Sequence, residues 1–200
     1  MIIAVEGIDG AGKNTLVTAL KGLIDARTLS FPRYEDSVHA QLAQEALHGR
    51  MGDLTDSAYA MATLFALDRA GVAEELRPYK GAQDRMIILD RYVASNAAYS
   101  AARTGDDGVF DWVYQLEFER LGLPTPDLQV LLATAPEEAS ARAKKRESED
   151  SARARDRYER DSDLQNNTYA AYVRLAEQNW AGRWVHSGDS GVILQEIEKL

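Results

Sequence analysis

The chain has 200 residues, of which 45% are hydrophobic and 28% charged, a composition ordinary for one folded domain with a substantial core. Its net charge of −9 argues against broad nucleic-acid binding, and the absence of cysteine excludes disulfides, thiolate metal sites and thiol catalysis. No basic leader precedes the first apolar run, and no apolar stretch approaches the roughly 20 residues of a membrane span. We therefore expect a cytoplasmic protein, one domain over residues 1–200, with no nucleic-acid or membrane partner.

Five short apolar runs predict strands, and longer segments with helical spacing separate them. The runs are Ile2–Val5, Thr28–Phe31, Met86–Leu89, Gln129–Ala133 and Trp184–His186. Strands that alternate with helices predict an α/β fold with a mainly parallel five-stranded sheet flanked by helices. Such sheets bind ligands beyond the carboxyl ends of their strands, so the residues after each run are the candidates for chemistry.

The first run leads into a glycine-rich loop. Its residues are Gly7, Ile8, Asp9, Gly10, Ala11, Gly12, Lys13, Asn14 and Thr15. Glycines let backbone N–H groups converge on an anion, and the lysine adds positive charge where a helix begins. The spacing matches a nucleotide-binding P-loop, except that the hydroxyl does not follow the lysine directly. A plain turn between a strand and a helix is the alternative, and the Lys-x-Thr sequence favours phosphate binding.

Residues 53–76 contain a predicted helix that is apolar on nearly every side, with its apolar residues between Ala58 and Ala70. Such a helix must be covered all round, either by the rest of the fold or by a partner chain. Phe65 and Arg69 are four residues apart and project from one face, where a ring and a guanidinium could clamp a flat polar base. Spacing alone favours the other interpretation, a core phenylalanine beside an arginine that reaches out to water.

The third run leads into a second dense cluster, from Asp90 to Tyr99. If a helix begins soon after Arg91, Ser95 and Tyr99 share one face and Asn96 flanks it. The fork of Arg91 suits a phosphate, and the amide of Asn96 has the donors and the acceptor needed to bind a base edge. Alternatively, Asp90 caps the helix and Tyr99 is a core aromatic.

The segment from Arg142 to Arg160 concentrates positive charge in an otherwise acidic chain. Eight basic residues stand against five acidic ones, a local excess of +3. The basic residues are Arg142, Lys144, Lys145, Arg146, Arg153, Arg155, Arg157 and Arg160. A solvated helix with ion pairs four residues apart is the ordinary interpretation. Two polyanions bound end to end would repel each other, however, so the P-loop favours a cationic segment that closes over them.

Together these motifs resemble the thymidylate kinase family over essentially the whole chain. The matching pieces are residues 7–15, residues 31–34, Phe65 with Asp68 and Arg69, residues 90–99 and residues 153–159. The resemblance implies the P-loop nucleoside monophosphate kinase fold, with a lid segment at about residues 142–157. It also implies transfer of a phosphoryl group from ATP to dTMP, giving dTDP, with Mg²⁺ as cofactor and a homodimeric assembly.

The resemblance further implies a role for each matching residue. ATP is expected at residues 7–15. Phe65 is expected to stack on thymine, with Arg69 and Asn96 on its polar edge and Tyr99 beneath the sugar. The other residues expected to bind dTMP are Asp9, Phe31, Tyr34, Arg91, Ser95 and Tyr158, of which Tyr34 and Arg91 hold the phosphate. The implied Mg²⁺ ligands are Asp9 and Glu159.

One departure from the family pattern concerns the transition-state cation. Some members carry an arginine inside the P-loop, whereas this chain has the uncharged Gly10 and Asn14 at the corresponding positions. We infer that lid arginines supply the charge, with Arg153 and Arg155 as the first candidates. The expected catalytic residues are therefore Asp9, Lys13, Arg91, Arg153 and Arg155.

Two other functions remain open at the level of sequence. A deoxynucleoside kinase, or a kinase for another monophosphate, would use the same scaffold, although Arg91 needs a phosphate partner. A GTPase-like switch is the more remote alternative. Guanine-binding switches normally carry an Asn-Lys-x-Asp stretch, and the chain contains no Asn-Lys pair.

Overall fold

The computed structural model describes residues 1–132, 134–149 and 157–200, and within them five parallel strands form one sheet. In the order in which they lie side by side, the strands are β2 (Ala26–Ser30), β3 (Met86–Asp90), β1 (Ile2–Glu6), β4 (Leu128–Leu131) and β5 (Trp184–His186). All five predicted strands are present, and the α/β prediction is confirmed. The bounds of β2 differ slightly from the prediction, because the strand begins at Ala26 rather than Thr28 and ends at Ser30 rather than Phe31.

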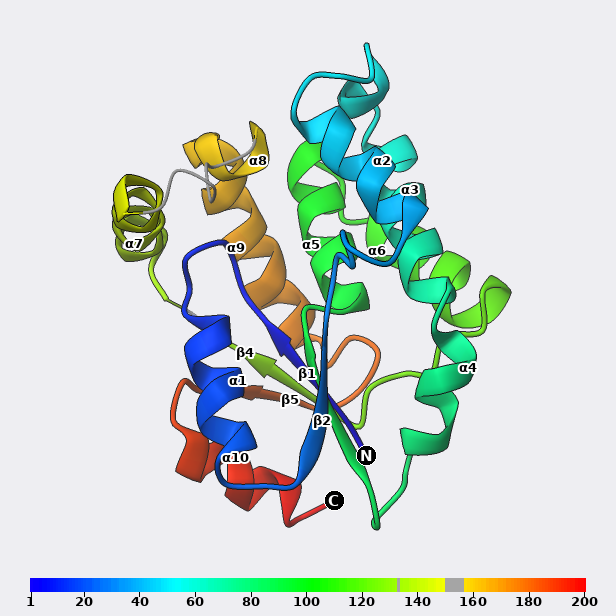
Figure 1. Ribbon diagram of the computed structural model, residues 1–200, viewed down its shortest axis with the longest axis vertical. Helices are drawn as coiled ribbons and strands as arrows, with labels where there is room; N and C mark the ends of the chain where they lie inside the picture. Colours follow the sequence, from blue (N-terminus) through cyan, green and yellow to red (C-terminus); the bar gives the residue numbers. More distant parts are fainter. Residues whose placement is uncertain (133, 150–156) are drawn as a thin grey trace.

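Helices cover both faces of this sheet. The longer ones are α1 (Lys13–Lys21), α2 (Val38–Leu47), α3 (Ala58–Ala70), α5 (Val93–Thr104), α7 (Pro136–Glu149), α9 (Ser162–Glu177) and α10 (Ser190–Ile197). The shorter ones are η1 (Leu54–Asp56), α4 (Ala73–Leu76), η2 (Arg77–Tyr79), α6 (Val109–Tyr114), the π-helical turn η3 (Gln115–Arg120) and α8 (Arg157–Arg160). Helices α1 and α10 lie on one face and α5 and α9 on the other (Figure 1). None of the described helices is both long and apolar enough to cross a bilayer.

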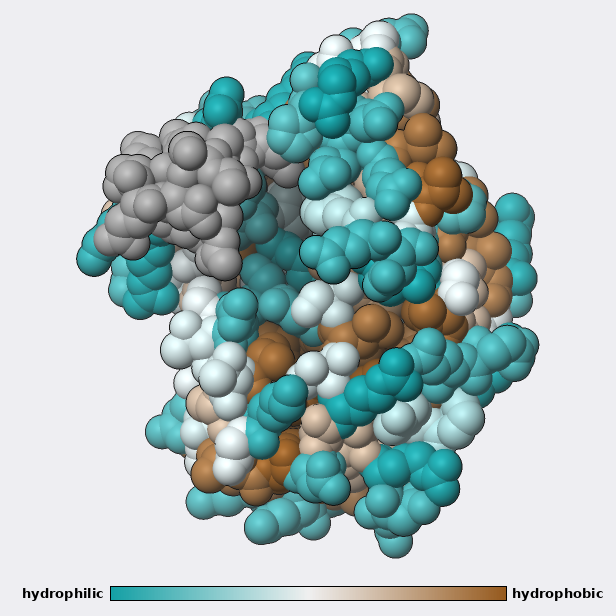
Figure 2. Space-filling model, in the orientation of Figure 1, coloured by the Kyte–Doolittle hydropathy of each residue, from teal (hydrophilic) through white to brown (hydrophobic). Residues whose placement is uncertain are grey.

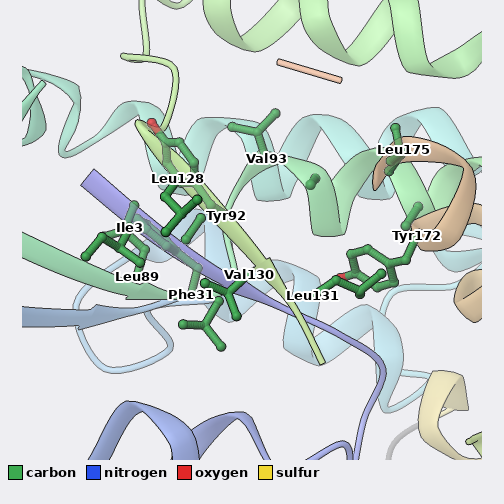
Figure 3. Packing of buried hydrophobic residues seen from close by; sticks show 14 of the residues in the cluster. Ile3, Phe31, Leu89, Tyr92, Val93, Leu128, Val130, Leu131, Tyr172 and Leu175 are labelled. Carbon is green, nitrogen blue, oxygen red and sulfur yellow. The ribbon is translucent and has the colours of Figure 1, made fainter. Parts of the chain in front are cut away.

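The centre of the sheet is buried on both faces. Every residue of β1 is fully buried, as its continuous apolar sequence requires in a parallel sheet with helices on both sides. Figure 3 shows part of this core, to which the strands contribute Ile3, Leu89 and Leu128 and the helices contribute Val93 and Tyr172. A rigid sheet of this kind fixes the positions of the loops at its edge.

The apolar helix predicted within residues 53–76 is confirmed as α3, and the shorter helices η1 and α4 flank it. Ser57 starts α3, since its hydroxyl accepts a hydrogen bond of 3.1 Å from the backbone N–H three residues on. Gly71 ends α3, and a Cβ at this position would lie 2.8 Å from Nη2 of Arg33. The loop after β2 therefore contacts the end of α3 through Arg33, which is also bonded to Asp68.

The loops that carry the sequence motifs emerge together. Val5 is in register with Asp90 of β3 on one side and with Val130 of β4 on the other. The segments that follow β1, β2 and β3 therefore leave the sheet at one edge, their carboxyl ends. A single site can draw on all of them.

Candidate active site

The glycine-rich loop after β1 ends in a helix start with open donors. Gly10 and Gly12 have φ angles of +80° and +99°, a region that favours glycine. Helix α1 begins after Gly12 with no side-chain cap, and the backbone N–H groups of residues 13–15 donate to no group in the described part of the chain. Unpaired N–H groups and the positive end of the helix dipole make this loop a site for an anion.

Lys13 is folded over the same loop. Its Nζ donates hydrogen bonds of 3.1 Å and 2.9 Å to the carbonyl oxygens of Gly7 and Ile8. Burial lowers the pKa of this ammonium to about 8, and the charge of Arg91 contributes to the shift. The lysine therefore lies in place to meet an anion, although Asp9, Asp90 and Glu6 are near enough to offset part of its pKa shift.

The beginning of α7 lies against this loop. The hydroxyl of Thr134 donates a 2.8 Å hydrogen bond to the carbonyl of Ala11, and Nη1 of Arg142 lies 3.4 Å from the same oxygen. Arg142 also pairs with Glu138 at 2.5 Å, four residues earlier, as the solvated-helix interpretation expects. The proposed lid cations Arg153 and Arg155 lie outside the described residues.

A cavity of about 310 Å³ opens next to the loop. The residues expected to bind dTMP or metal that line it are Asp9, Phe31, Tyr34, Phe65, Arg69, Arg91, Ser95, Asn96, Tyr99, Tyr158 and Glu159. The lining is completed by Pro32, by Gln44 and Leu47 of α2, and by His48 directly after α2. Pro32 belongs to the motif at residues 31–34, whereas the other three carried no signal in the sequence. Figure 2 shows the hollow in the middle of the molecule, beside the surface of α2 and α3.

Arg91 and Asp9 form an ion pair at the loop end of this cavity. Arg91 has a φ of +66°, a conformation that non-glycine residues rarely adopt and that is often held at functional sites. Its backbone N–H bonds the carbonyl of Val5 at 2.9 Å, and its Nη1 bonds the carbonyl of Gly7 at 2.9 Å. The alternative in which Asp90 caps the following helix is wrong, because α5 begins after Tyr92 without a side-chain cap.

The charge of Asp9 is held firmly. Burial acts to raise the pKa of this carboxyl, but Arg91, Lys13 and the hydroxyl of Tyr99 outweigh it and lower the pKa to about 2. The Tyr99 hydroxyl donates a 2.6 Å hydrogen bond to Oδ2 of Asp9. Tyr99 is therefore more than a core aromatic, since it ties α5 to the glycine-rich loop.

Glu6 binds the two hydroxyls that contact Arg91, and the sequence analysis missed this residue. The carboxylate is fully buried and accepts hydrogen bonds from the hydroxyls of Ser95 and Tyr172, at 2.6 Å and 3.1 Å. Both hydroxyls also accept from Nη1 of Arg91, at 3.2 Å and 3.4 Å. Burial raises the pKa of Glu6 despite these bonds. The only signal was a carboxylate ending an apolar strand, which a sequence does not distinguish from an exposed one.

At the far end of the cavity, Arg69 does not reach out to water. It is 3% exposed and forms a buried ion pair with Glu117 of η3, so the interpretation of a solvent-seeking arginine is wrong. Burial opposes the charge, but Glu117 more than compensates and raises the pKa of Arg69. Phe65 and Asn96 line the cavity beside it, so the spacing of residues 65 and 69 does place both on one wall.

The predicted metal ligands Asp9 and Glu159 line the same cavity. The described residues contain no group of three or more histidine, aspartate or glutamate side chains that could hold a metal by themselves. Two carboxylates suit a hard cation that keeps several waters and takes phosphate oxygens as further ligands, so the residues present fit Mg²⁺.

Comparison with known proteins identifies relatives along almost the whole chain. Residues 5–188 match the family described as thymidylate kinase. A thymidylate kinase from Mycobacterium tuberculosis is 55% identical over 196 residues, which cover 94% of this chain and 91% of the relative. One from Bifidobacterium longum is 33% identical over 182 residues, or 88% of this chain and 84% of the relative.

Solved structures share the fold at lower identity. A thymidylate kinase from Candida albicans superposes with a TM-score of 0.72 at 23% identity, covering 99% of this chain and 91% of its own. A deoxyadenosine kinase from M. mycoides has a TM-score of 0.65 at 17% identity and full coverage of both chains. Because both identities are below 25%, these two likenesses establish the architecture only.

Proposed function

The chain belongs to the thymidylate kinase family and catalyses the ATP-dependent phosphorylation of dTMP to dTDP, and we propose that dTMP binds in the cavity of about 310 Å³ beside the glycine-rich loop. The observation that carries this proposal is that one cavity gathers side chains from three segments. Asp9 comes from the loop after β1, Phe65 and Arg69 come from α3, and Arg91 and Tyr99 come from the β3–α5 segment.

The proposed orientation follows from the chemistry of the two ends of the cavity. Arg91 and Tyr34 suit the 5′-phosphate, since a guanidinium and a hydroxyl both donate hydrogen bonds to phosphate oxygens. Phe65 and the buried polar pair of Arg69 and Asn96 suit a base, through stacking and hydrogen bonding. The phosphate then points toward residues 7–15, where the donors of α1 and Lys13 hold the phosphates of ATP.

Catalysis in this arrangement is alignment and charge stabilisation. The attacking oxygen of dTMP is already anionic at neutral pH, so no strong general base is required. Asp9 orients Arg91 and Tyr99 rather than abstracting a proton, in keeping with its low pKa. Arg153 and Arg155 supply positive charge at the transferred phosphoryl group, and lid closure excludes water from it.

Mg²⁺ is the cofactor in this proposal, with Asp9 and Glu159 as the side chains that would hold it. Both line the cavity, and both offer the oxygen ligands that this ion prefers. When bound, the ion neutralises charge on the phosphates of the two nucleotides.

We propose a homodimer that uses the surface of α2 and α3. These helices pack on each other and carry two of the exposed large apolar residues, Val38 at 60% and Tyr59 at 46% exposure. Figure 2 shows apolar atoms gathered at the upper right, where Figure 1 places α2 and α3. We expect gel filtration with light scattering to give twice the mass of the chain, and Tyr59→Glu to shift the protein to the monomer. A monomeric wild type contradicts this part of the proposal.

A coupled assay of ADP release tests the acceptor site. We expect turnover with dTMP to exceed that with thymidine, dUMP, dCMP and AMP, and thymidine as the preferred acceptor would favour the deoxynucleoside kinase alternative. Phe65→Ala should raise the KM for dTMP by about tenfold, the effect of one lost base–aromatic stack, and leave the KM for ATP unchanged. Leu64→Ala, on the same helix but not lining the cavity, is the matched control. An unchanged KM for dTMP in Phe65→Ala contradicts the proposed site.

A further inference from the structure

Glu117 lies behind the base end of the cavity and contacts two of its lining residues. It is fully buried in the π-helical turn η3. Its Oε2 accepts a 2.6 Å hydrogen bond from Nε of Arg69, and its Oε1 accepts one of 2.7 Å from Nη2 of the same residue. The same Oε1 accepts a 2.7 Å hydrogen bond from Nδ2 of Asn96. Arg69 and Asn96 therefore meet at one carboxylate oxygen.

These contacts fix which atom of the Asn96 amide faces the cavity. Its Nδ2 also donates a 3.0 Å hydrogen bond to the carbonyl oxygen of Ala62. A carboxylate and a carbonyl only accept hydrogen bonds, so the atom that meets both must be the NH₂ group. The opposite atom, Oδ1, has no hydrogen-bond partner in the described part of the chain, and Asn96 lines the cavity. The asparagine therefore offers an acceptor to a ligand.

Arg69 offers the complementary atom. Two of its three nitrogens, Nε and Nη2, are bonded to Glu117. Its Nη1 makes no hydrogen bond within residues 1–132, 134–149 and 157–200, and a guanidinium nitrogen can only donate. The wall thus presents a donor beside an acceptor. Thymine presents an acceptor, O4, beside a donor, N3–H, whereas cytosine presents an amino donor beside the N3 acceptor.

We propose that Glu117 is a specificity-determining residue that never touches the base: by accepting from both Arg69 and Asn96, it fixes the donor–acceptor order that fits thymine and opposes cytosine. The inference rests on the proposed binding of the dTMP base in this cavity. Without a purely accepting group at position 117, only the carbonyl of Ala62 still selects the orientation of the Asn96 amide, so the flipped orientation becomes accessible. It then presents NH₂ to the ligand, which suits N3 of cytosine.

The test is the ratio of kcat/KM for dTMP to kcat/KM for dCMP. Glu117→Gln keeps the shape but gives the side chain an NH₂ group, so we expect the ratio to fall by about tenfold or more, the weight of one buried hydrogen bond. Glu119→Gln, an exposed residue of the same turn, should leave the ratio unchanged. Glu117→Asp, whose carboxylate still only accepts hydrogen bonds, should keep most of the wild-type preference for dTMP over dCMP. Equal losses on both substrates in Glu117→Gln would mean a merely structural ion pair and overturn the proposal.

Two further measurements keep the outcomes separable. Asn96→Ala should raise the KM for dTMP; if it does not, the proposed position of the base is wrong, whatever Glu117→Gln does. Should Glu117→Gln fail to fold, amide hydrogen exchange of the wild-type side chains takes its place. The Asn96 side-chain NH₂ should exchange much more slowly than that of the exposed Asn166 in the free protein, and equally slowly with dTMP bound. Exchange as fast as that of Asn166 overturns the proposal.

Discussion

Arg33 and Asp68 join two walls of the proposed dTMP cavity, and breaking this pair should affect stability and acceptor binding together. Nε of Arg33 lies 3.0 Å from Oδ1 of Asp68, its backbone N–H donates to Oδ2 at 3.0 Å, and its Nη2 donates to the Asp68 carbonyl at 2.5 Å. The Asp68 side chain is fully buried, and that of Arg33 is 12% exposed. The pair ties residues 31–34 to α3, and both segments line the cavity.

The expected loss of stability follows from the burial of the two side chains. Removing one partner of a buried ion pair leaves an uncompensated charge, which costs about 3–5 kcal/mol. Asp68→Asn keeps the volume and one acceptor oxygen, so we expect the lower end, about 3 kcal/mol of the free energy of unfolding. Arg33→Met leaves Asp68 with a bond from the backbone N–H of residue 33, so a similar loss is expected. The double variant should cost about 2–3 kcal/mol less than the sum of the two, because neither charge is then stranded.

Urea unfolding followed by circular dichroism gives the three free energies, and the steady-state KM values give the functional effect. We expect the KM for dTMP to rise by roughly tenfold in Asp68→Asn, as one cavity wall loses its fixed position, and the KM for ATP to stay constant. Asp107 and Arg174 form a pair at 2.7 Å, closer than Arg33 and Asp68 at 3.0 Å, but their side chains are 45% and 39% exposed. The same cycle there should give a coupling of about 1 kcal/mol or less. Additive losses at Arg33 and Asp68, or an unchanged KM for dTMP, would refute the reasoning.

Three further predictions concern the phosphates. Lys13 must be protonated to attract a phosphate, and its pKa is lowered to about 8, so ATP affinity should fall about tenfold between pH 7 and pH 9. Calorimetry should show no such loss of affinity with pH in Lys13→Arg. The same loss in that variant would assign the titration to another group. Gly10→Ala would put Cβ 2.1 Å from a backbone carbonyl oxygen of α7 at a φ of +80°, so we expect ATP binding to be lost, whereas Gly49→Ala, with a φ of +76° and open space, should bind normally. Arg153→Ala or Arg155→Ala should lower kcat by about 10³ and change dTMP binding far less, and near-normal kcat in the double variant would contradict their assignment.

The elements that the sequence predicts correctly are those set by local pattern. Strand β1 is apolar at four successive positions because both faces are buried, and this can be recognised without any neighbour. The glycine-rich loop is equally local, since its glycines are needed by its own backbone. The rule that parallel strands direct ligands to their carboxyl ends then brings residues 7–15, 31–34 and 90–99 together before any side-chain contact is known.

What the sequence does not predict depends on partners far along the chain. Glu6 and Tyr172 are 166 residues apart, and Arg69 and Glu117 are 48 apart, so no spacing rule connects them. Buried and exposed carboxylates look alike in a sequence. The contact at the end of α3 is also of this kind, because the guanidinium of Arg33, which lies 2.8 Å from where a Cβ of Gly71 would be, is 38 residues away in the sequence.

The carboxylates that pair with Arg69 and Arg91 also explain how one cavity can accommodate both a neutral base and an anion. A neutral base needs a fixed order of donors and acceptors. At the base end Glu117 holds Arg69 from behind the cavity wall. The charge of Arg69 is therefore compensated whether the cavity is empty or full. A phosphate needs a cationic hydrogen-bond donor within reach. At that end Arg91 is compensated by Asp9, which lines the cavity and is 22% exposed, so an incoming phosphate meets the guanidinium and its partner together. The two ends therefore differ in where the counter-charge lies: behind the arginine for the base and beside it for the phosphate. Because both arginines are already held in place by their carboxylates, little rearrangement is needed when the substrate binds.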